Sequence, residues 1–265
     1  MGVLTSLKAS KIIESKRVLI TAGASGIGLA IAEACVAQGA RVHICDIDDE
    51  ALDQCRKKLP FVTSSHADVA DESDVETLFR DVHEHLGGLD ALVNNAGIGG
   101  PAGPVETLSA ADWRRCLDVC LTGQFLCTRL AVPLLKAAGG GALINMSSQA
   151  GRHGFIFRSA YTAAKFGVIG FTQALAKELG PANIRVNAIL PGPIAGERIG
   201  RMLEAKAARS GRSVQEETAQ LLSTTSMGKM IEPEEVAGMA ILLISPLGSS
   251  ISGQSIGVCG NTFTL

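Results

Sequence analysis

Short apolar runs alternate with longer stretches of mixed apolar and polar residues along almost the whole chain. Several of these runs are nearly continuously apolar, which is typical of parallel strands that are covered on both faces. Seven segments are predicted to be strands: Arg17–Thr21, Arg41–Asp46, Phe61–Ala67, Ala91–Asn94, Gly141–Met146, Ile184–Leu190 and Gln254–Val258. Their alternation with helical stretches predicts an α/β protein, a single-domain doubly wound parallel sheet over residues 1–265.

Helical stretches with clear ends lie between these strands. Four of them are predicted to be helices: Gly26–Gln38, Asp71–Leu86, Ser109–Ala138 and Ser159–Leu179. Glycine follows directly after the first, the second and the fourth, and glycine is favoured just beyond a helix C-terminus. Ser109 and Asp112 resemble a capping box at the start of the third helix.

One segment interrupts the alternation of strands and helices. From Pro191 to about Ile231 no strand is predicted, and the sequence is polar and helical in character. Open α/β sheets bind their ligands beyond the carboxyl ends of the strands. We therefore predict a substrate lid over residues 193–231, with a solvated helical excursion or a subunit contact as the alternatives.

The bulk composition excludes several classes of protein. Of the 265 residues, 46% are hydrophobic and 19% are charged, which argues against disorder. A net charge of −2 provides no basic field for nucleic acid or a membrane surface. No apolar run reaches the ~18 residues of a membrane span, and Met1 to Lys16 lacks the apolar core of a signal peptide. We expect neither nucleic acid nor a membrane as a partner.

The seven cysteines indicate a reducing compartment. Their number is odd, none belongs to a C-x-x-C pair, and most lie in apolar runs. This pattern predicts reduced, buried thiols in a cytoplasmic protein. Cys116 and Cys120 are spaced i, i+4, but no histidine or third cysteine is near them in sequence, so we expect no metal site.

A glycine-rich turn follows the first predicted strand. The segment from Thr21 to Gly28 reads T-A-G-A-S-G-I-G and opens the first predicted helix, which is the context of a dinucleotide-binding turn. Glycines let the backbone approach a pyrophosphate, and the helix N-terminus supplies free N–H groups and positive partial charge. A plain strand–helix turn is the alternative. The candidate cofactor-binding residues here are Gly23, Ser25, Gly26 and Ile27.

The ends of the next three strands extend this candidate cofactor site. Asp46 ends the second strand, where a carboxylate accepts hydrogen bonds from ribose hydroxyls and repels a 2′-phosphate, so NAD is favoured over NADP. A helix N-cap is the alternative role of Asp46. After the third strand, Asp68 and Val69 are suited to the edge and the face of adenine. After the fourth strand, the segment Asn95, Ala96 and Gly97 contains small residues that let the backbone approach the cofactor.

Tyr161 and Lys165 are spaced to act together. They lie i, i+4 at the start of a predicted helix and so share one face. A free phenol ionises only near pH ~10, and a neighbouring ammonium favours the phenolate, which makes Tyr161 a candidate for proton exchange with a substrate oxygen. Ser148, at the end of the fifth strand, precedes Tyr161 by 13 residues, and a loop of that length returns it to the helix start.

Taken in order, these motifs resemble the classical short-chain dehydrogenase/reductase (SDR) family. The resemblance covers the chain from about Lys16 to its end. The motifs are T-x-G-x-x-G-I-G, Asp46, Asp68-Val69, N-N-A-G, Ser148, Y-T-A-A-K and Pro191-Gly192. The resemblance implies a seven-stranded Rossmann-like sheet and direct hydride transfer between nicotinamide and a substrate carbon.

The same resemblance implies roles for individual residues. Tyr161 is expected to be the acid/base, Lys165 to bind the nicotinamide ribose, and Ser148 to position the substrate oxygen. Pro191, Gly192 and Ile194 are expected to contact the cofactor. A homotetramer is also implied, in which the helices over residues 109–138 and 159–179 pair between subunits.

The sequence departs from the family pattern at three positions of interest. Ala22 stands where the turn usually has its first glycine, and Gly196 stands where a threonine usually contacts the carboxamide. Cys120 replaces an asparagine that helps to hold a water in a proton relay from the lysine to solvent. A thiol is a weak donor and a weak acceptor, so this relay is in question.

The loop between Ser148 and Tyr161 is expected to border the substrate. Its basic residues Arg152, His153 and Arg158 are candidates to hold a carboxylate, sulfonate or phosphate, with solvent or a neighbouring subunit as their alternative partners. We expect an NAD(H)-dependent oxidoreductase that interconverts a secondary alcohol and a ketone, on a small polar or anionic hydroxy compound such as a sugar or hydroxy acid. The alternatives are a 3-oxoacyl thioester reductase and a non-catalytic NAD(H)-binding sensor or scaffold.

Overall fold

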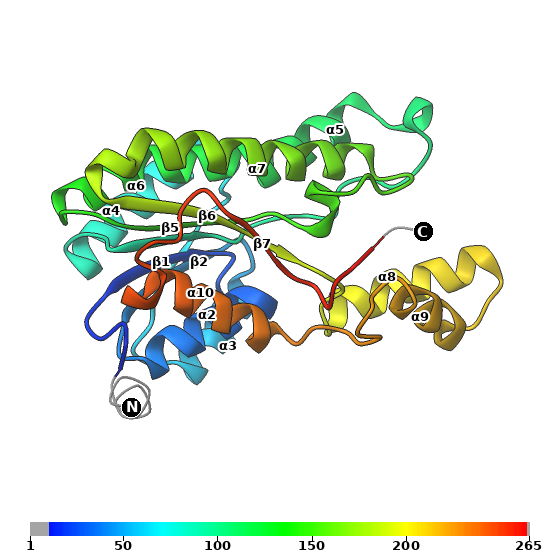
Figure 1. The fold of residues 1–265 in the computed structure, drawn as a ribbon, viewed down its shortest axis with the longest axis horizontal. Helices are drawn as coiled ribbons and strands as arrows, with labels where there is room; N and C mark the ends of the chain where they lie inside the picture. Colours follow the sequence, from blue (N-terminus) through cyan, green and yellow to red (C-terminus); the bar gives the residue numbers. More distant parts are fainter. Residues whose placement is uncertain (1–10, 264–265) are drawn as a thin grey trace.

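The computed structural model describes residues 11–263, and their centre is one parallel sheet (Figure 1). The strands are β1 (Arg17–Thr21), β2 (Arg41–Asp46), β3 (Thr63–His66), β4 (Ala91–Asn94), β5 (Gly141–Met146), β6 (Ile184–Pro191) and β7 (Ser255–Val258). They lie in the order β3-β2-β1-β4-β5-β6-β7, and every neighbouring pair is parallel. The predicted doubly wound α/β fold is confirmed.

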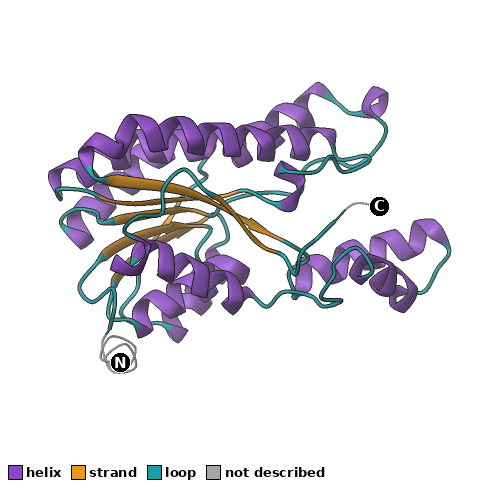
Figure 2. Ribbon diagram, viewed as in Figure 1, coloured by secondary structure: helices purple, strands orange, loops and turns teal. Residues whose placement is uncertain are grey.

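Helices cover both faces of the sheet (Figures 1 and 2). On one face lie α2 (Gly26–Ala37), α3 (Asp49–Lys58) and α10 (Pro233–Ile244), and on the other α4 (Glu72–Leu86), α5 (Ala110–Leu117), α6 (Gly123–Ala137) and α7 (Ser159–Leu179). Successive side chains of a strand point to opposite faces of the sheet, and each face has its own hydrophobic core. In β1, for example, Ile20 packs with the α2 and α10 side, whereas its neighbour Leu19 packs with the α4 and α6 side. Burial on both faces explains the continuous apolar runs.

The third predicted strand is shorter than the sequence analysis indicated. Phe61 is 88% exposed in a turn, and β3 begins only at Thr63. This strand is at the edge of the sheet and has polar side chains, so burial does little to define its ends.

The predicted helix over Ser109–Ala138 is interrupted by a widened turn. A π-helical segment, Asp118–Thr122, joins α5 to α6, and the N–H of Gly123 donates to the carbonyl oxygen of Asp118, five residues back. The joined helix Ala110–Ala137 has the length and apolar composition of a membrane span. Its α6 half, however, packs on the sheet and on α4.

The predicted lid segment forms two helices, α8 (Glu197–Ser210) and α9 (Val214–Leu222), that extend beyond the ends of β6 and β7 (Figure 1). The fully buried carboxylate of Glu217 holds them together, because it accepts from Ser210 Oγ at 2.6 Å and pairs with Lys206 Nζ at 2.7 Å. A β-bridge between Ile194 and Ile231 closes the base of the segment.

Candidate active site

The turn between β1 and α2 presents free backbone donors at the carboxyl edge of the sheet. Ser25 is the N-cap residue of α2, and no side chain caps this helix, so its first N–H groups have no partner within the helix. Around Gly26, whose φ is +52°, no atom lies within 4 Å of the position that a Cβ would take. The turn therefore has the open space and the donors that a phosphate needs.

Close packing fixes two other glycines of this turn. A Cβ at Gly28 would lie 2.0 Å from the carbonyl oxygen of Ala22, and one at Gly23 would lie 2.6 Å from Ile44 Cβ. Ala22, which replaces the family's usual glycine, has a φ of +49°. Left-handed backbone costs an alanine about 1 kcal/mol, and the bonds that hold the turn compensate for this cost.

The segment after β4 is bonded directly to this turn. Thr21 Oγ1 accepts from the backbone N–H groups of Asn95 and Ala96, both at 2.9 Å. The side-chain amide of Asn95 donates in return to the carbonyl oxygens of Thr21 and Ala22, both at 3.0 Å. The structure thus brings together two of the candidate cofactor-binding segments that the sequence analysis identified separately.

Asp46 is placed at the end of β2, beside the glycine-rich turn. Its carboxylate accepts from the N–H of Ala24 at 3.2 Å and from the N–H of Ile47 at 2.9 Å. The alternative role as a helix N-cap is wrong, because Asp48 caps α3 by accepting from the N–H of Ala51. Asp46 therefore anchors the turn, and its Oδ2 retains a free acceptor position toward the site.

The remaining candidate cofactor-binding residues also lie at strand ends. Asp68 pairs with Arg115 of α5 at 2.7 Å, and Val69 is buried against Gly123, where an added Cβ would lie 2.8 Å from Val69 Cγ2. Gly192 is packed so closely on Cys259 that a Cβ would come within 2.7 Å of its Cα.

Pro191 and Ile194 flank Gly192, and the backbone around them is also fixed. Pro191 is the last residue of β6, and Ile194 forms the bridge to Ile231. Gly196, at the usual threonine position, has a φ of +136°, a conformation that favours glycine over any side chain.

Tyr161 and Lys165 share one face of α7, as predicted. The Lys165 ammonium lies 5.6 Å from the centre of the Tyr161 ring and donates to the carbonyl oxygen of Met146 at 2.8 Å. The same nitrogen would be 3.4 Å from a Cβ at Gly97, so it faces the segment after β4. Lys165 is 3% exposed, and such burial of a cation requires partners.

Ser148 stands at the carboxyl end of β5, where it begins a short 3₁₀ turn, Gln149–Gly151. Its hydroxyl accepts from the N–H of Ala150 at 3.1 Å, which leaves its proton free to donate. The adjacent Ser147 donates to the carbonyl oxygen of Lys165 at 2.8 Å. This bond ties the Ser148 turn to the helix that carries Tyr161.

A buried polar chain behind these residues was missed by the sequence analysis. The Asn94 amide donates to Thr128 Oγ1 and to Asn145 Oδ1, both at 3.0 Å, and Asn145 donates to Thr172 Oγ1 at 3.0 Å. This chain of hydrogen bonds links β4, β5, α6 and α7, and so fixes the strand ends that carry the site. The available signal was an asparagine within each of two otherwise apolar strands, since buried polar groups require partners.

Cys120 lies in the π-helical segment, fully buried beside Cys116. Its thiol contacts the carbonyl oxygen of Ile98 at 3.3 Å, as a donor. A hydrogen bond from Cys116 lowers the pKa of the Cys120 thiol, and Lys165 acts in the same direction, while burial opposes both. Cys120 is therefore bonded to the segment after β4 and lies in the field of Lys165.

The structure gives the two arginines of the loop before α7 different partners. Arg152 is turned away from Tyr161, and its guanidinium donates to the carbonyl oxygen of Ser255 in β7 at 2.8 Å. Arg158 instead lies over the Tyr161 ring, 5.3 Å from its centre. His153 is half-buried. Of the two arginines proposed for substrate contact, it is Arg158 that lies against Tyr161.

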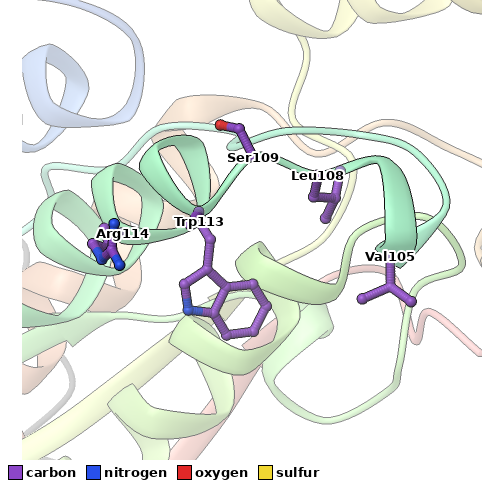
Figure 3. Close-up of a pocket in the computed structure, with 6 residues that line it drawn as sticks. Val105, Leu108, Ser109, Trp113 and Arg114 are labelled. Atoms are coloured by element: carbon purple, nitrogen blue, oxygen red, sulfur yellow. The ribbon is translucent and has the colours of Figure 1, made fainter.

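A pocket of about 400 Å³ lies at the start of α5 (Figure 3). It is lined by Val105, Leu108, Ser109, Ala110, Trp113 and Arg114. None of the candidate catalytic or cofactor-binding residues lines it. The candidate catalytic residues lie instead at the carboxyl edge of the sheet, after β5 and at the start of α7.

Comparison with known proteins identifies the family of the chain. Residues 21–260 match the family described as enoyl-(acyl carrier protein) reductase. An uncharacterised oxidoreductase of Mycobacterium bovis is 37% identical over 257 residues, which cover 96% of this chain and 99% of that protein. The chain belongs to the short-chain dehydrogenase/reductase family. The SDR resemblance of the sequence motifs is thereby confirmed, and the protein is an SDR oxidoreductase.

Other SDR proteins resemble the chain over nearly its full length. Galactitol 2-dehydrogenase of Agrobacterium fabrum is 34% identical over 254 residues, which cover 95% of this chain and 98% of that enzyme. A variant of actinorhodin polyketide ketoreductase, solved with NADPH, superposes with a TM-score of 0.89 at 32% identity, covering 93% of this chain and 96% of that one. These SDR relatives differ in substrate.

Proposed function

We propose that this SDR protein is an NAD(H)-dependent dehydrogenase that interconverts a secondary alcohol and a ketone in a small polar hydroxy compound. The observation that carries the proposal is the arrangement of three side chains. Tyr161 and Lys165 share a face of α7, and Ser148 follows β5 at the start of a turn that Ser147 bonds to the same helix. Galactitol 2-dehydrogenase, which is similar to this chain, supports a substrate with hydroxyl groups.

The chemistry divides between the cofactor and these side chains. Nicotinamide, when bound, supplies or accepts the hydride. Tyr161 gives its phenolic proton to the substrate oxygen during reduction and takes it back during oxidation. Lys165 supplies the fixed positive charge beside the phenol and would donate to a ribose hydroxyl of the bound cofactor, and Ser148 would donate to the substrate oxygen and so orient it.

Asp46 supports NAD as the cofactor. Its carboxylate lies at the end of β2, beside the turn whose free N–H groups suit a pyrophosphate. A 2′-phosphate on the adenosine ribose would meet this negative charge. Residues 47–49 are Ile47, Asp48 and Asp49, so the segment that follows offers no cation to offset it. Gly23, Ser25, Gly26 and Ile27 would hold the pyrophosphate, and Asp68 and Val69 the adenine.

We extend the proposal to the assembly and setting of the enzyme. Phe125 of α6 and Phe166 of α7 are 46% and 47% exposed, and large exposed apolar side chains on neighbouring long helices support pairing between subunits in a homotetramer. The helices α8 and α9 act as the substrate lid. The free cysteines among the described residues support a reducing, cytoplasmic setting.

A 3-oxoacyl thioester reductase is the second candidate. The matched family is described as enoyl-(acyl carrier protein) reductase, which names an acyl-thioester substrate, and the superposed ketoreductase was solved with NADPH. Asp46 argues against this candidate, because its charge disfavours the 2′-phosphate of NADPH. A non-catalytic NAD(H) sensor or scaffold is disfavoured by the presence of all three of Ser148, Tyr161 and Lys165.

A turnover screen separates these functions. The purified protein is assayed with NAD and NADP against polyols and hydroxy acids, and with NADH and NADPH against a 3-oxoacyl thioester. We expect NAD-linked oxidation of secondary alcohols and a loss of about 10²–10⁴-fold in kcat for Tyr161→Phe, with cofactor binding retained. NADPH-linked thioester reduction as the dominant activity would establish the second candidate. Activity of Tyr161→Phe near that of the wild type would remove Tyr161 from its role.

A further inference from the structure

Two arginines from distant parts of the chain converge on the segment that follows β4, and one of them lies over the Tyr161 ring. Arg158 precedes α7, and Arg198 lies in the first turn of the lid helix α8. A methyl group placed on Gly99 would lie 3.2 Å from Arg158 Nη2 and 3.6 Å from Arg198 Nη2. The two guanidinium groups therefore flank the same point on the segment that follows β4.

Among the residues that the structure describes, neither of these two cations has an acidic partner. Within residues 11–263, Arg158 and Arg198 form no ion pair with a carboxylate. Their only polar contacts there are with backbone carbonyl oxygens, from Arg158 to Gly99 at 2.5 Å and from Arg198 to Gly97 at 3.4 Å. Each guanidinium has five N–H donors, so most donors of both remain free.

Neighbouring arginines show the contrast. Arg201, one turn further along α8, pairs with Glu197, and Arg115 of α5 pairs with Asp68. Within residues 11–263, Arg158 and Arg198 approach the same point of the Gly97–Gly99 segment, and no carboxylate pairs with either of them. Like charges at short range repel, and a bound oxyanion relieves the repulsion while it satisfies the free donors.

One arginine of the pair, Arg158, lies close to Tyr161, the candidate acid/base. The guanidinium carbon of Arg158 is 5.3 Å from the centre of the Tyr161 ring, and Lys165 Nζ is 5.6 Å from the same centre. An anion held between Arg158 and Arg198 therefore lies a short carbon chain away from the substrate oxygen that Tyr161 serves. Arg152, from the same loop as Arg158, is bonded to β7 and takes no part.

We propose that Arg158 and Arg198 bind an oxyanion of the substrate, so that the enzyme prefers short hydroxy acids, or their phosphate-ester counterparts, to uncharged alcohols. The inference rests on the proposed dehydrogenase function and narrows its substrate class. Because Arg198 belongs to α8, the anion also links the lid to the catalytic helix. Hydroxy acids and hydroxyalkyl phosphates share this recognition chemistry, and the assay distinguishes them.

The test compares matched substrates. With NAD, kcat/KM is measured for 3-hydroxybutyrate, for its methyl ester, and for 2-hydroxypropyl phosphate. We expect at least one of the two anions to exceed the ester by about tenfold or more, as charge-assisted bonds to two guanidinium groups predict. A larger value for 3-hydroxybutyrate identifies a carboxylate as the natural group, and a larger value for the phosphate identifies a phosphate ester. An ester that is oxidised as well as both anions overturns the inference.

Variants locate the effect on the arginine pair. Arg198→Met keeps the aliphatic stem and removes the charge, and we expect the anion-to-ester ratio to fall about tenfold or more. Arg201→Met is the matched control from the same helix, and its ratio should equal that of the wild type. Arg198→Lys should keep part of the preference. An equal fall in Arg198→Met and Arg201→Met would show a general effect of lid charge and would refute the assignment.

A binding measurement separates this inference from the proposed function. Acetoacetate and methyl acetoacetate are titrated calorimetrically into enzyme saturated with NAD, a combination in which hydride transfer cannot occur. We expect acetoacetate to bind about tenfold more tightly than its ester in the wild type, and this difference to disappear in Arg198→Met. If no alcohol is oxidised but this pattern holds, the proposed function fails and the anion site stands. If alcohols are oxidised and acetoacetate binds no better than its ester, the anion site fails and the dehydrogenase stands.

Discussion

Mild acid should destabilise this protein through one buried side chain, His43 of β2. The side chain is fully buried, and its ring nitrogens bond with Thr63 Oγ1 at 2.7 Å and Ser65 Oγ at 3.0 Å. Burial lowers the pKa of His43 from 6.5 to about 4, the charge on His85 acts in the same direction, and Asp81 opposes them. The ring of His85 stacks on that of His43, with 5.6 Å between their centres.

The size and sign of the effect follow from the two pKa values. The folded protein holds His43 neutral, whereas the unfolded chain takes up a proton below about pH 6.5. The contribution of His43 to the free energy of unfolding is therefore complete above pH 6.5 and is lost as the pH falls toward 4. A decrease in pKa from 6.5 to about 4 corresponds to about 3 kcal/mol in total, of which about 2 kcal/mol is lost by pH 5.

Urea denaturation at pH 7.5 and pH 5, at one fixed protein concentration, measures this loss. His43→Val fills the same buried strand position without a titrating group. The other histidines and the carboxylates are present in both proteins, so the difference between the two losses isolates His43. We expect the wild type to lose about 2 kcal/mol more than the variant. Equal losses in the two proteins would refute the argument.

Four further predictions concern the cofactor turn, the relay and the assembly. Asp46→Ala should reduce the ratio of NAD to NADP in kcat/KM, and a wild type that binds NADPH more tightly than NADH would contradict our assignment of Asp46. Gly28→Ala should abolish NADH binding in a fluorescence titration, because its methyl group would collide with the Ala22 carbonyl and displace the turn. Cys120→Asn should melt at a lower temperature, since burial of an amide without partners costs about 1–3 kcal/mol. Its kcat should hold or rise, and a tenfold fall in the folded variant would show that the site is adapted to the thiol. Light scattering at micromolar concentration should give the mass of a tetramer, and the mass of one chain would exclude it.

The sequence predicts the central strands, and the outer ends of the four helices to which it assigns bounds, to within about one residue, for a physical reason. Strands buried on both faces must be apolar throughout, and glycines mark the helix ends at Gly39 and Gly87. The edge strand β3 escapes this rule because its side chains are polar. The sequence pattern also does not reveal the π-helical segment Asp118–Thr122, since one extra residue in a turn alters the apolar spacing too little to be recognised.

Within the site, the sequence identifies the residues whose roles depend on local spacing. Tyr161 and Lys165 need only one turn of helix to meet. The arginines are different, because tertiary contacts decide which of them stays free. Arg152 and Arg158 come from the same loop, but only the second remains near Tyr161. Arg198 reaches the site from 37 residues beyond Tyr161, and no local pattern relates them.

The widened turn between α5 and α6 has a consequence for how this chain can evolve. An α-helix turns about 100° per residue, so the loss of one residue from Asp118–Thr122 would rotate α6 by about that angle relative to α5. The side chains of Cys127, Ala131 and Leu135, now fully buried, would then leave the sheet, and the hydrophobic contacts of a whole layer would be lost. Point substitutions here change single contacts, whereas insertions and deletions change the phase of the helix. We therefore expect descendants of this gene to vary in residue type along this helix but to keep its length.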